Sequence, residues 1–345
     1  MADEERHAGA LVTWKDRKVL VTGGAGFLGS HLCKALADLG AVVVCADQQT
    51  DSPSLRVLGV SDRITRQRRN VVWPGNIRLS ILAEKPSVVF HLAGAAHIHP
   101  AQAAPVAAIE TNVMGTVQVL EACREYRDSG ATLDAVIVSS SNHVYGSRPG
   151  YAFHEGNALD QGDIYGAAKG AQDLIARAYA KSYGLPVIAL RHTNAYGPAN
   201  PHAGHIVIAT ILSLLKGEAP VILSDGTPVK GYLYVDDLIA AYLAAAKLAT
   251  GGMCAGALNV SPNGPISVLA LVDMVIQASG LDLVPDVRGE DLTQTGYWEH
   301  LDSSLFRKWI GWKPGVSLAE GLRRTYEWFA EHKGMAWVST SGERR

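Results

Sequence analysis

Unbroken apolar runs alternate with segments of helical periodicity through the first part of the chain. The apolar runs are short and rich in β-branched residues, as expected of parallel strands buried on both faces, and lie at 19–22, 41–47, 86–94 and 135–139. Segments 107–127 and 164–183 instead repeat their apolar positions with the period of an α-helix. We therefore predict an α/β fold with a doubly wound parallel sheet covered by helices.

A weaker signal predicts one further strand. Residues 52–69 are mostly polar and predict an irregular connection, while 70–73 and the following 74–77 predict a third strand and its exit. The most basic run of the chain, 63–69, lies in this region, and we expect it on a solvated surface.

The second part of the chain is less regular. Helical patterns lie at 206–217, 236–248, 267–279 and 318–332, short strand patterns lie at 221–223 and 232–234, and a loop is expected at 198–205. We predict a large sheet domain over 15–193, with 232–262 packing back on it. Segments 194–231 and 263–332 are expected to form a smaller α+β lobe, and 1–14 and 335–345 are expected to be flexible tails.

Composition indicates a globular protein of ordinary charge. The chain has 345 residues, of which 48% are hydrophobic and 19% charged, and its formal net charge is −2. This balance gives no electrostatic argument for binding nucleic acid or a membrane surface, and no apolar run reaches transmembrane length. The charged start lacks the apolar core of a secretion signal, and the four cysteines have no metal or redox spacing. We expect a cytoplasmic protein with buried free thiols.

The first predicted strand runs directly into a glycine-rich turn. Gly23, Gly26 and Gly29 lie in TGGAGFLG, and a helical pattern follows at once. Gly23 suits a tight turn, Gly26 lets a ligand approach the backbone, and Gly29 lets the helix pack close to the strand. Because the N–H groups at the start of the helix favour a pyrophosphate, this order predicts a dinucleotide-binding Rossmann unit.

An acidic residue, Asp47, ends the second predicted strand. It stands roughly 20 residues beyond the glycine turn, where an acid accepts hydrogen bonds from the adenosine ribose and repels a 2′-phosphate. Asp47 therefore favours NAD over NADP as the cofactor.

Tyr165 and Lys169 are candidate catalytic residues on the helix predicted at 164–183. They are four residues apart and share one helical face. A phenol has a pKa near ~10, which the ammonium and an oxidised nicotinamide would lower towards the working range. Tyr165 would then take a proton from a sugar hydroxyl while hydride leaves the same carbon. Lys169 would bond the nicotinamide ribose, and Ser141, at the end of the preceding strand, would hold the same substrate oxygen.

Together these segments resemble the extended short-chain dehydrogenase/reductases that modify nucleotide sugars, the NAD-dependent epimerase/dehydratase family. The resembling segments are TGGAGFLG, the strand-ending Asp47, HLAG, ETNVMGTVQVLEAC, SSSNHVYG, YGAAK, RHTNAYGP, SDGTPVKGYLYVDD and DSSLFRKWIGWKPGVSLAEGLRRT, which span nearly the whole chain. The resemblance implies a bound NAD, a catalytic set of Ser141, Tyr165 and Lys169, and a C-terminal lobe that holds a nucleoside diphosphate. It also implies a homodimer whose interface is a four-helix bundle of 107–127 and 165–183.

The resemblance also assigns binding residues by position. For NAD they are Gly23, Gly26, Phe27, Leu28 and Gly29 at the pyrophosphate, Asp47 at the ribose, Asn76 and Ile77 at the adenine, Leu92, Ala93 and Gly94 beside the cofactor, and Asn112 behind the nicotinamide half. For the nucleotide sugar they are Ser141, Asn142, His97, Asn194, Lys230 and Arg288. Asn76 replaces the usual Asp. Lys230 replaces the usual Arg, so a bidentate fork to phosphate is lost.

Three reactions of the family begin with oxidation of a sugar carbon. An epimerase returns the hydride to the other face, a 4,6-dehydratase also eliminates water, and a dehydrogenase releases NADH. The dehydratases typically carry Asp-Glu, or Asp and another polar residue, at the positions of Asn142 and His143. Asn142 cannot transfer a proton, so His143 alone would have to serve as both the acid and the base of a dehydration. We therefore predict an epimerase, with His143 as an additional catalytic candidate.

Other readings remain open. DGTPVKGYLYVDD and TNVMGTVQVLEAC resemble the CDP-glucose 4,6-dehydratase-like branch, and SNHV resembles uronate dehydrogenases. A non-catalytic NAD-binding sensor would generally lack the Tyr or the Lys that this chain keeps. His143 could also be structural. His97 and His99 have the spacing of metal ligands, but no third ligand is in sight, so we expect contact with the sugar and no metal.

Overall fold

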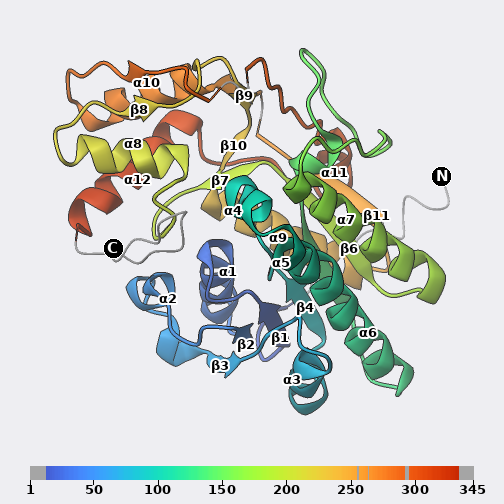
Figure 1. The fold of residues 1–345 in the computed structure, drawn as a ribbon. Helices are drawn as coiled ribbons and strands as arrows, with labels where there is room; N and C mark the ends of the chain where they lie inside the picture. Colours follow the sequence, from blue (N-terminus) through green and yellow to red (C-terminus); the bar gives the residue numbers. More distant parts are fainter. Residues whose placement is uncertain (1–12, 255, 263, 292–294, 334–345) are drawn as a thin grey trace. The chain divides into compact units, whose positions relative to one another are not determined.

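A seven-stranded sheet confirms the predicted fold class (Figure 1). Its strand order is β11-β6-β5-β4-β1-β2-β3. The strands are β1 (Lys18–Thr22), β2 (Val42–Asp47), β3 (Thr65–Arg68), β4 (Val88–His91), β5 (Ala135–Ser141), β6 (Val187–His192) and β11 (Gly256–Val260). Neighbours from β5 to β3 are paired in parallel, so their carboxyl ends share one edge of the sheet.

The computed structural model describes residues 13–254, 256–262, 264–291 and 295–333. The chain divides into two units. The first consists of Met1–Ser141, Asp163–Arg191 and Ile239–Leu258, and the second of Asn142–Gly162, His192–Leu238 and Asn259–Arg345. The chain therefore passes from the first unit to the second directly after Ser141.

Helices and short helical turns connect the strands of the sheet. They are α1 (Phe27–Asp38), α2 (Pro53–Val57), the short η2 (Ser61–Arg63), α3 (Asn76–Glu84), α4 (Ile98–Ala103), α5 (Pro105–Ile109), η3 (Glu110–Met114), α6 (Gly115–Asp128), α7 (Ile164–Tyr183) and α9 (Val235–Thr250). Helix α7 has the predicted bounds. Its first turn is capped by Asp163, whose carboxylate accepts from the Gly166 N–H at 2.9 Å.

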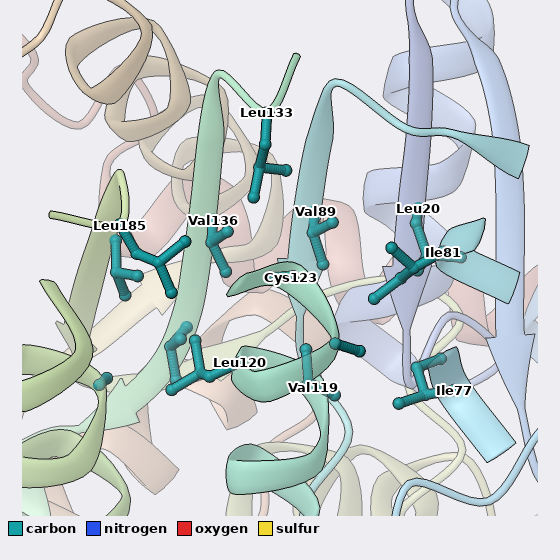
Figure 2. Close-up of a cluster of buried hydrophobic side chains, with 14 of the residues drawn as sticks. Leu20, Ile77, Ile81, Val89, Val119, Leu120, Cys123, Leu133, Val136 and Leu185 are labelled. Carbon is teal, nitrogen blue, oxygen red and sulfur yellow. The ribbon is translucent and has the colours of Figure 1, made fainter. Parts of the chain in front are cut away.

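The main hydrophobic core lies between the sheet and helices α3 and α6 (Figure 2). Leu20, Val89 and Val136 contribute from three adjacent strands, and they meet Ile77 and Ile81 of α3 and Val119, Leu120 and Cys123 of α6. Successive strand residues face opposite sides, so Phe90 lies on the other face, with its ring 6.5 Å from that of Tyr242 in α9. Each fully buried Leu, Ile or Phe of this kind contributes about 1.5–3 kcal/mol, which holds the strand ends in place.

The third strand lies earlier than predicted. Strand β3 is formed by Thr65–Arg68, within the stretch expected to be irregular, and residues 70–73 are not a strand. The Asn70 side chain accepts from the Val72 N–H at 2.9 Å, and the Asn76 side chain accepts from the Asn70 N–H at 2.7 Å, so this segment is a turn. The prediction was wrong because β3 is a polar edge strand with no apolar signal.

The helix predicted over 107–127 contains a π-helical turn. Helix α5, turn η3 and helix α6 follow one another without a break. Asn112 lies in η3, and its side-chain amide bonds both backbone groups of Ala95, at 2.8 Å to the N–H and 3.1 Å to the carbonyl. The Asn112 backbone carbonyl accepts from the Thr116 hydroxyl at 2.7 Å. Such turns often occur at functional sites, and this one fixes Asn112 against the segment after β4.

The second unit has its own core. Its elements are η4 (Asn142–Tyr145), β7 (Asn194–Tyr196), α8 (Ile206–Leu214), β8 (Val221–Ile222), β9 (Val229–Lys230), β10 (Tyr232–Tyr234), β12 (Ile266–Ser267), α10 (Val268–Ser279), β13 (Asp286–Val287), α11 (Ser304–Ile310) and α12 (Leu318–Glu331). Apolar side chains of α8, α10 and α12 pack together with tyrosines of β7 and β10. Strand β9 pairs with β12, which places Lys230 opposite Ile266.

Several expectations from composition concern single residues. Cys33, Cys45 and Cys123 are buried free thiols, as predicted, and Cys254 is exposed. Trp14 was expected in the N-terminal tail, but it is buried with its ring 6.2 Å from that of Phe90. The rest of both expected tails lies outside the described residues, apart from residue 13. In the described part of the chain, no helix combines the length and apolar content needed to cross a bilayer.

Candidate active site

The glycine turn after β1 leaves no room for side chains. Gly23 has φ +70°, and a Cβ there would lie 2.6 Å from the Ala93 backbone nitrogen. A Cβ on Gly29 would lie 2.6 Å from the Gly24 Cα and closer still to the Gly23 carbonyl oxygen. Both positions therefore need glycine, since real Cβ atoms do not approach so closely.

Gly26 differs because the space beside it is open. A Cβ there would meet only the Gly23 carbonyl oxygen, at 3.4 Å. Gly26 is the N-cap of α1, and no side chain caps that helix. The first N–H groups of α1 are thus directed to a ligand or to solvent, which is the donor set that a pyrophosphate requires. Phe27 and Leu28 supply the first residues of this helix. The turn fits a dinucleotide.

Asp47 lies beside the same turn. Its carboxylate accepts from the Ala25 N–H at 3.1 Å and from the Gln49 N–H at 3.0 Å. Burial raises the pKa of this carboxyl, and the backbone donors oppose that shift. The side chain is half-buried at the carboxyl end of β2, where it could receive ribose hydroxyls.

The remaining cofactor candidates lie after β3 and β4. Asn76 begins α3, and the Ile77 side chain is fully buried in the core shown in Figure 2. The Leu92 N–H donates to the Thr22 carbonyl at 3.1 Å, which continues the β4–β1 ladder past His91. Ala93 and Gly94 follow as half-buried small residues at the same sheet edge as Gly23.

Lys169 is the best-defined catalytic candidate. Its ammonium donates to the Ser139 carbonyl at 3.0 Å and to the Gln172 side-chain oxygen at 2.9 Å. Burial lowers the pKa of this ammonium to about 8, although Asp173 partly opposes the shift. A Cβ on Gly94 would lie 3.3 Å from the Lys169 Nζ, so the ammonium sits directly against the segment after β4.

Tyr165 precedes Lys169 by one turn of α7. Its side chain is 8% exposed and packs with Ala101 and Ala108. Ser141 is the last residue of β5 and is also buried. The two serines before it have interior partners: Ser139 accepts from the Tyr242 hydroxyl and Ser140 donates to Asp173, both at 2.8 Å. Sequence order thus leaves Ser141 as the serine at the strand end.

A buried polar chain links Lys169 to the end of β1. Gln172 receives the ammonium and donates its own N–H to the Thr116 hydroxyl at 2.8 Å. That hydroxyl lies 2.8 Å from Nε2 of His91, whose Nδ1 lies 2.7 Å from the Thr22 hydroxyl. Burial lowers the pKa of His91 to about 3. Gln172 and His91 were not predicted in this role, because the contacts that join them come from separate elements of the folded chain.

His143 has a partner that sequence reasoning missed. In the second unit its Nε2 lies 2.9 Å from Oε1 of Glu299, and the two side chains are 8% and 1% exposed. The Tyr297 hydroxyl lies 3.4 Å from the Nδ1 of the same ring. Burial alone would raise the pKa of Glu299, but His143, Lys230 and Tyr297 together lower it to about 2. We call His143, Lys230, Tyr297 and Glu299 the histidine cluster.

The other substrate candidates are spread over the chain. Asn194 donates to the Gly231 carbonyl at 3.3 Å, and the Lys230 Nζ lies 5.4 Å from the centre of the Tyr297 ring. Arg288 is exposed and pairs with Asp286 at 3.0 Å.

Two histidines and Asn142 complete the set of candidates. His97 is the N-cap residue of α4, and burial lowers its pKa. His99 follows within α4, and Asn142 begins η4 as a buried residue. Among the described residues, no three His, Cys, Asp or Glu side chains lie together as metal ligands would.

A family model and a curated relative each match most of this chain. A family model described as the NAD dependent epimerase/dehydratase family matches residues 19–261. The UDP-glucose 4-epimerase of Mycolicibacterium smegmatis is 31% identical over 320 residues, which cover 90% of this chain and 98% of that protein.

Solved structures of similar proteins include both reaction types. A UDP-glucose 4-epimerase from Thermotoga maritima, solved with UDP-glucose, has a TM-score of 0.81 at 27% identity and covers 92% of this chain and 99% of its own. A dTDP-glucose 4,6-dehydratase from Streptomyces venezuelae, solved with NAD bound, has a TM-score of 0.80 at 27% identity. The match covers 93% of this chain and 98% of that chain.

Proposed function

This chain belongs to the NAD-dependent epimerase/dehydratase family, and from that premise we propose that it is a nucleotide-sugar epimerase. NAD, when bound over the glycine turn, accepts hydride from a sugar carbon and returns it. The observation that carries the proposal is the pair of Tyr165 and Lys169 on α7, with the Lys169 ammonium held at the end of β5. Tyr165 removes the proton of the sugar hydroxyl and later returns one, and Ser141 holds the same oxygen.

The residues of the glycine turn and the strand ends would hold the cofactor. We assign the pyrophosphate to the α1 N-terminus and the adenosine ribose to Asp47, because one presents uncapped N–H groups and the other a carboxylate. The adenine is assigned to Asn76 and Ile77.

The substrate is assigned to the residues that the family resemblance implies. Asn194, Lys230 and Arg288 would bind the diphosphate, and two of these supply positive charge. His97 and Asn142 would contact the sugar.

A second candidate reaction is 4,6-dehydration. It is favoured by one observation, the Glu299 carboxylate beside His143, since a dehydration needs an acid and a base beyond Tyr165. The similarity to solved epimerases and dehydratases supports both candidates.

We also propose that the protein is a cytoplasmic homodimer built on α5, η3, α6 and α7. Large apolar side chains on these elements are exposed, namely Val106, Ile109, Met114, Ile164 and Leu174. Solvent-exposed apolar residues at this density are typical of a surface that a second copy covers. The scattered cysteines, three of them buried free thiols, support the cytoplasm.

The proposal is tested with purified protein, NAD and a panel of nucleoside-diphosphate hexoses. Product with unchanged mass and no net NADH is expected for an epimerase. A product lighter by one water identifies the dehydratase, and steady accumulation of NADH identifies a dehydrogenase. Bound NAD with no turnover of any sugar would contradict an enzymatic role.

A further inference from the structure

The Lys169 ammonium is held by neutral acceptors, although an acidic side chain lies within reach on the same helix. Gln172 and Asp173 follow Lys169 in α7 by three and four residues, and both spacings bring helical side chains together. The ammonium donates to the Gln172 side-chain oxygen and to the Ser139 backbone carbonyl. In the part of the chain that the structure describes, it makes no ion pair with a carboxylate. The residue that receives the ammonium on α7 is therefore the uncharged one.

Asp173 does not receive the ammonium because its carboxylate is already saturated. Arg191, Arg177 and the Ser140 hydroxyl give it four hydrogen bonds of 2.7–2.9 Å, two on each oxygen. Two donors on each oxygen use the acceptor capacity of a carboxylate. Asp173 is thus compensated by two guanidinium groups, and its contact with them leaves the Lys169 charge without a direct counter-ion.

Gln172 is fixed in one orientation from its other end. Its side chain has no exposed surface, and its amide nitrogen lies 2.8 Å from the Thr116 hydroxyl. That hydroxyl donates to the Asn112 backbone carbonyl, so it can only accept from Gln172. The Gln172 nitrogen must therefore face Thr116, and its oxygen must face Lys169. Gln172 offers the ammonium a fixed acceptor that carries no charge.

One N–H of the ammonium remains for a ligand. An ammonium has three N–H groups, and Ser139 and Gln172 receive two of them. Among the described residues, no third acceptor bonds this ammonium. A Cβ on Gly94 would lie 3.3 Å from the Lys169 Nζ and 2.7 Å from the Asn112 side-chain oxygen. The glycine therefore leaves the space beside Nζ open on the side of the segment after β4.

We infer that Gln172 is a positioning residue that orients the Lys169 ammonium without neutralising it, and so leaves its charge and one N–H for NAD. This inference rests on the proposed function, which assigns Lys169 to the nicotinamide ribose. A carboxylate in place of the amide would pair with the ammonium and reduce its effect on the Tyr165 phenol. The titratable groups that face Lys169 or Tyr165 are Asp173 on α7, His91 on β4 and Tyr242 on α9.

The test is calorimetric titration of NAD into the full-length protein over a range of pH. The parent should lose NAD affinity as the pH rises through about 8, because the ammonium loses its proton there. Gln172→Glu should move this loss to a pH higher by about 1 or more, since an adjacent carboxylate stabilises the ammonium. Gln172→Met keeps the length but removes the acceptor, so the loss should move to lower pH and NAD affinity at neutral pH should fall about 10-fold.

A double variant separates positioning from a merely structural role. In the Lys169→Met background, neither Gln172→Glu nor Gln172→Met should alter the pH dependence of NAD affinity, because Gln172 acts through the ammonium. NMR of lysines labelled at Cε gives an independent readout, with the Lys169 signal assigned by its loss in Lys169→Met. Its pKa should be about 8 in the parent and higher in Gln172→Glu.

The matched control is Gln277→Glu, which adds the same charge at an exposed position of α10 in the second unit. It should change neither NAD affinity nor the Lys169 signal, and thermal melting establishes that each variant folds. A pH dependence that is the same for the parent and Gln172→Glu, or that Gln172→Glu still shifts without Lys169, would overturn the inference and leave the proposed function intact. The expected shifts with no turnover of any nucleotide sugar would support the inference and overturn the proposed epimerase alone.

Discussion

Arg191 and Asp173 form a doubly hydrogen-bonded ion pair with no exposed surface on either side chain. The Arg191 Nε and Nη2 donate to the two carboxylate oxygens at 2.8 and 2.7 Å. Ser140 and Arg177 donate to the same carboxylate at 2.8 and 2.9 Å. Asp173 therefore joins α7 to β5 and β6, directly behind the strand end that carries Ser141.

Asp173→Asn is expected to lower the free energy of unfolding by about 3–5 kcal/mol, because it leaves a buried guanidinium without its counter-charge. Urea denaturation measures the loss. The control is Glu327→Gln, which breaks an exposed pair with Arg323 and should cost no more than about 0.5 kcal/mol. Similar losses of unfolding free energy for the two variants would show that burial of the Arg191–Asp173 pair does not contribute to its effect on stability.

Gly26→Ala and Gly29→Ala should separate cofactor binding from folding. Gly26→Ala should leave the free energy of unfolding within about 1 kcal/mol, because the added Cβ has room. It should lower NAD affinity at least about 10-fold, since the methyl group occupies the space that the pyrophosphate needs.

Gly29→Ala should reduce both quantities, with a cost of about 1–3 kcal/mol in stability, because the Cβ collides with the Gly23 backbone. Calorimetric titration with NAD and urea denaturation provide the two measurements. Gly162→Ala is the control, since nothing lies within 4 Å of its added Cβ. A Gly26→Ala variant that binds NAD as tightly as the parent would place the pyrophosphate elsewhere.

Lys169 should make the stability of the protein depend on pH. Burial lowers its pKa from 10.5 to about 8, so between these values the unfolded chain binds more protons than the folded one. Stability therefore rises with pH through this window, by up to about 3 kcal/mol, and none of this gain is present below pH 8.

Lys169→Met removes the titrating group. The difference in free energy of unfolding between parent and variant should thus change by that amount between about pH 7 and about pH 10, measured with urea at each pH. The subtraction cancels other titrating groups. A difference that is independent of pH would mean that the ammonium keeps an ordinary pKa.

Val106→Glu combined with Leu174→Glu should convert the proposed dimer into a monomer. These side chains are 68% and 53% exposed on α5 and α7, and a pair of carboxylates in an apolar interface should weaken association at least about 100-fold. Light scattering at micromolar concentration measures the mass. Val284→Glu, at a 79% exposed position of the second unit, should leave it unchanged. A parent protein that is already monomeric would contradict the proposal.

The elements that sequence predicted well are those whose signal is local. The β-branched runs of β1, β2, β4 and β5 need burial on both faces, and the helical period of α7 is visible without knowing its neighbours. Strand β3 was missed because it is held by its pairing with β2 and not by apolar residues of its own.

The residues of the candidate site also differ in whether a short segment of sequence is enough to identify them. Gly23, Gly29 and the Tyr165–Lys169 spacing could be found because their geometry is contained in one short segment. Glu299 could not be found from the sequence, since its role depends on a contact with His143 that forms only in the folded chain.

The buried chain behind Lys169 also fixes the position of every proton along it. The Thr116 hydroxyl donates its single proton to the Asn112 carbonyl. It can therefore only accept hydrogen bonds from Gln172 and from His91. Nε2 of His91 must therefore carry the ring proton.

Because His91 stays neutral at any pH well above about 3, its Nδ1 is an acceptor, and the Thr22 hydroxyl must donate to it. The buried side chains between β1 and α7 thus adopt a single His91 tautomer and a single set of Thr22 and Thr116 hydroxyl orientations. This arrangement does not depend on a bound cofactor.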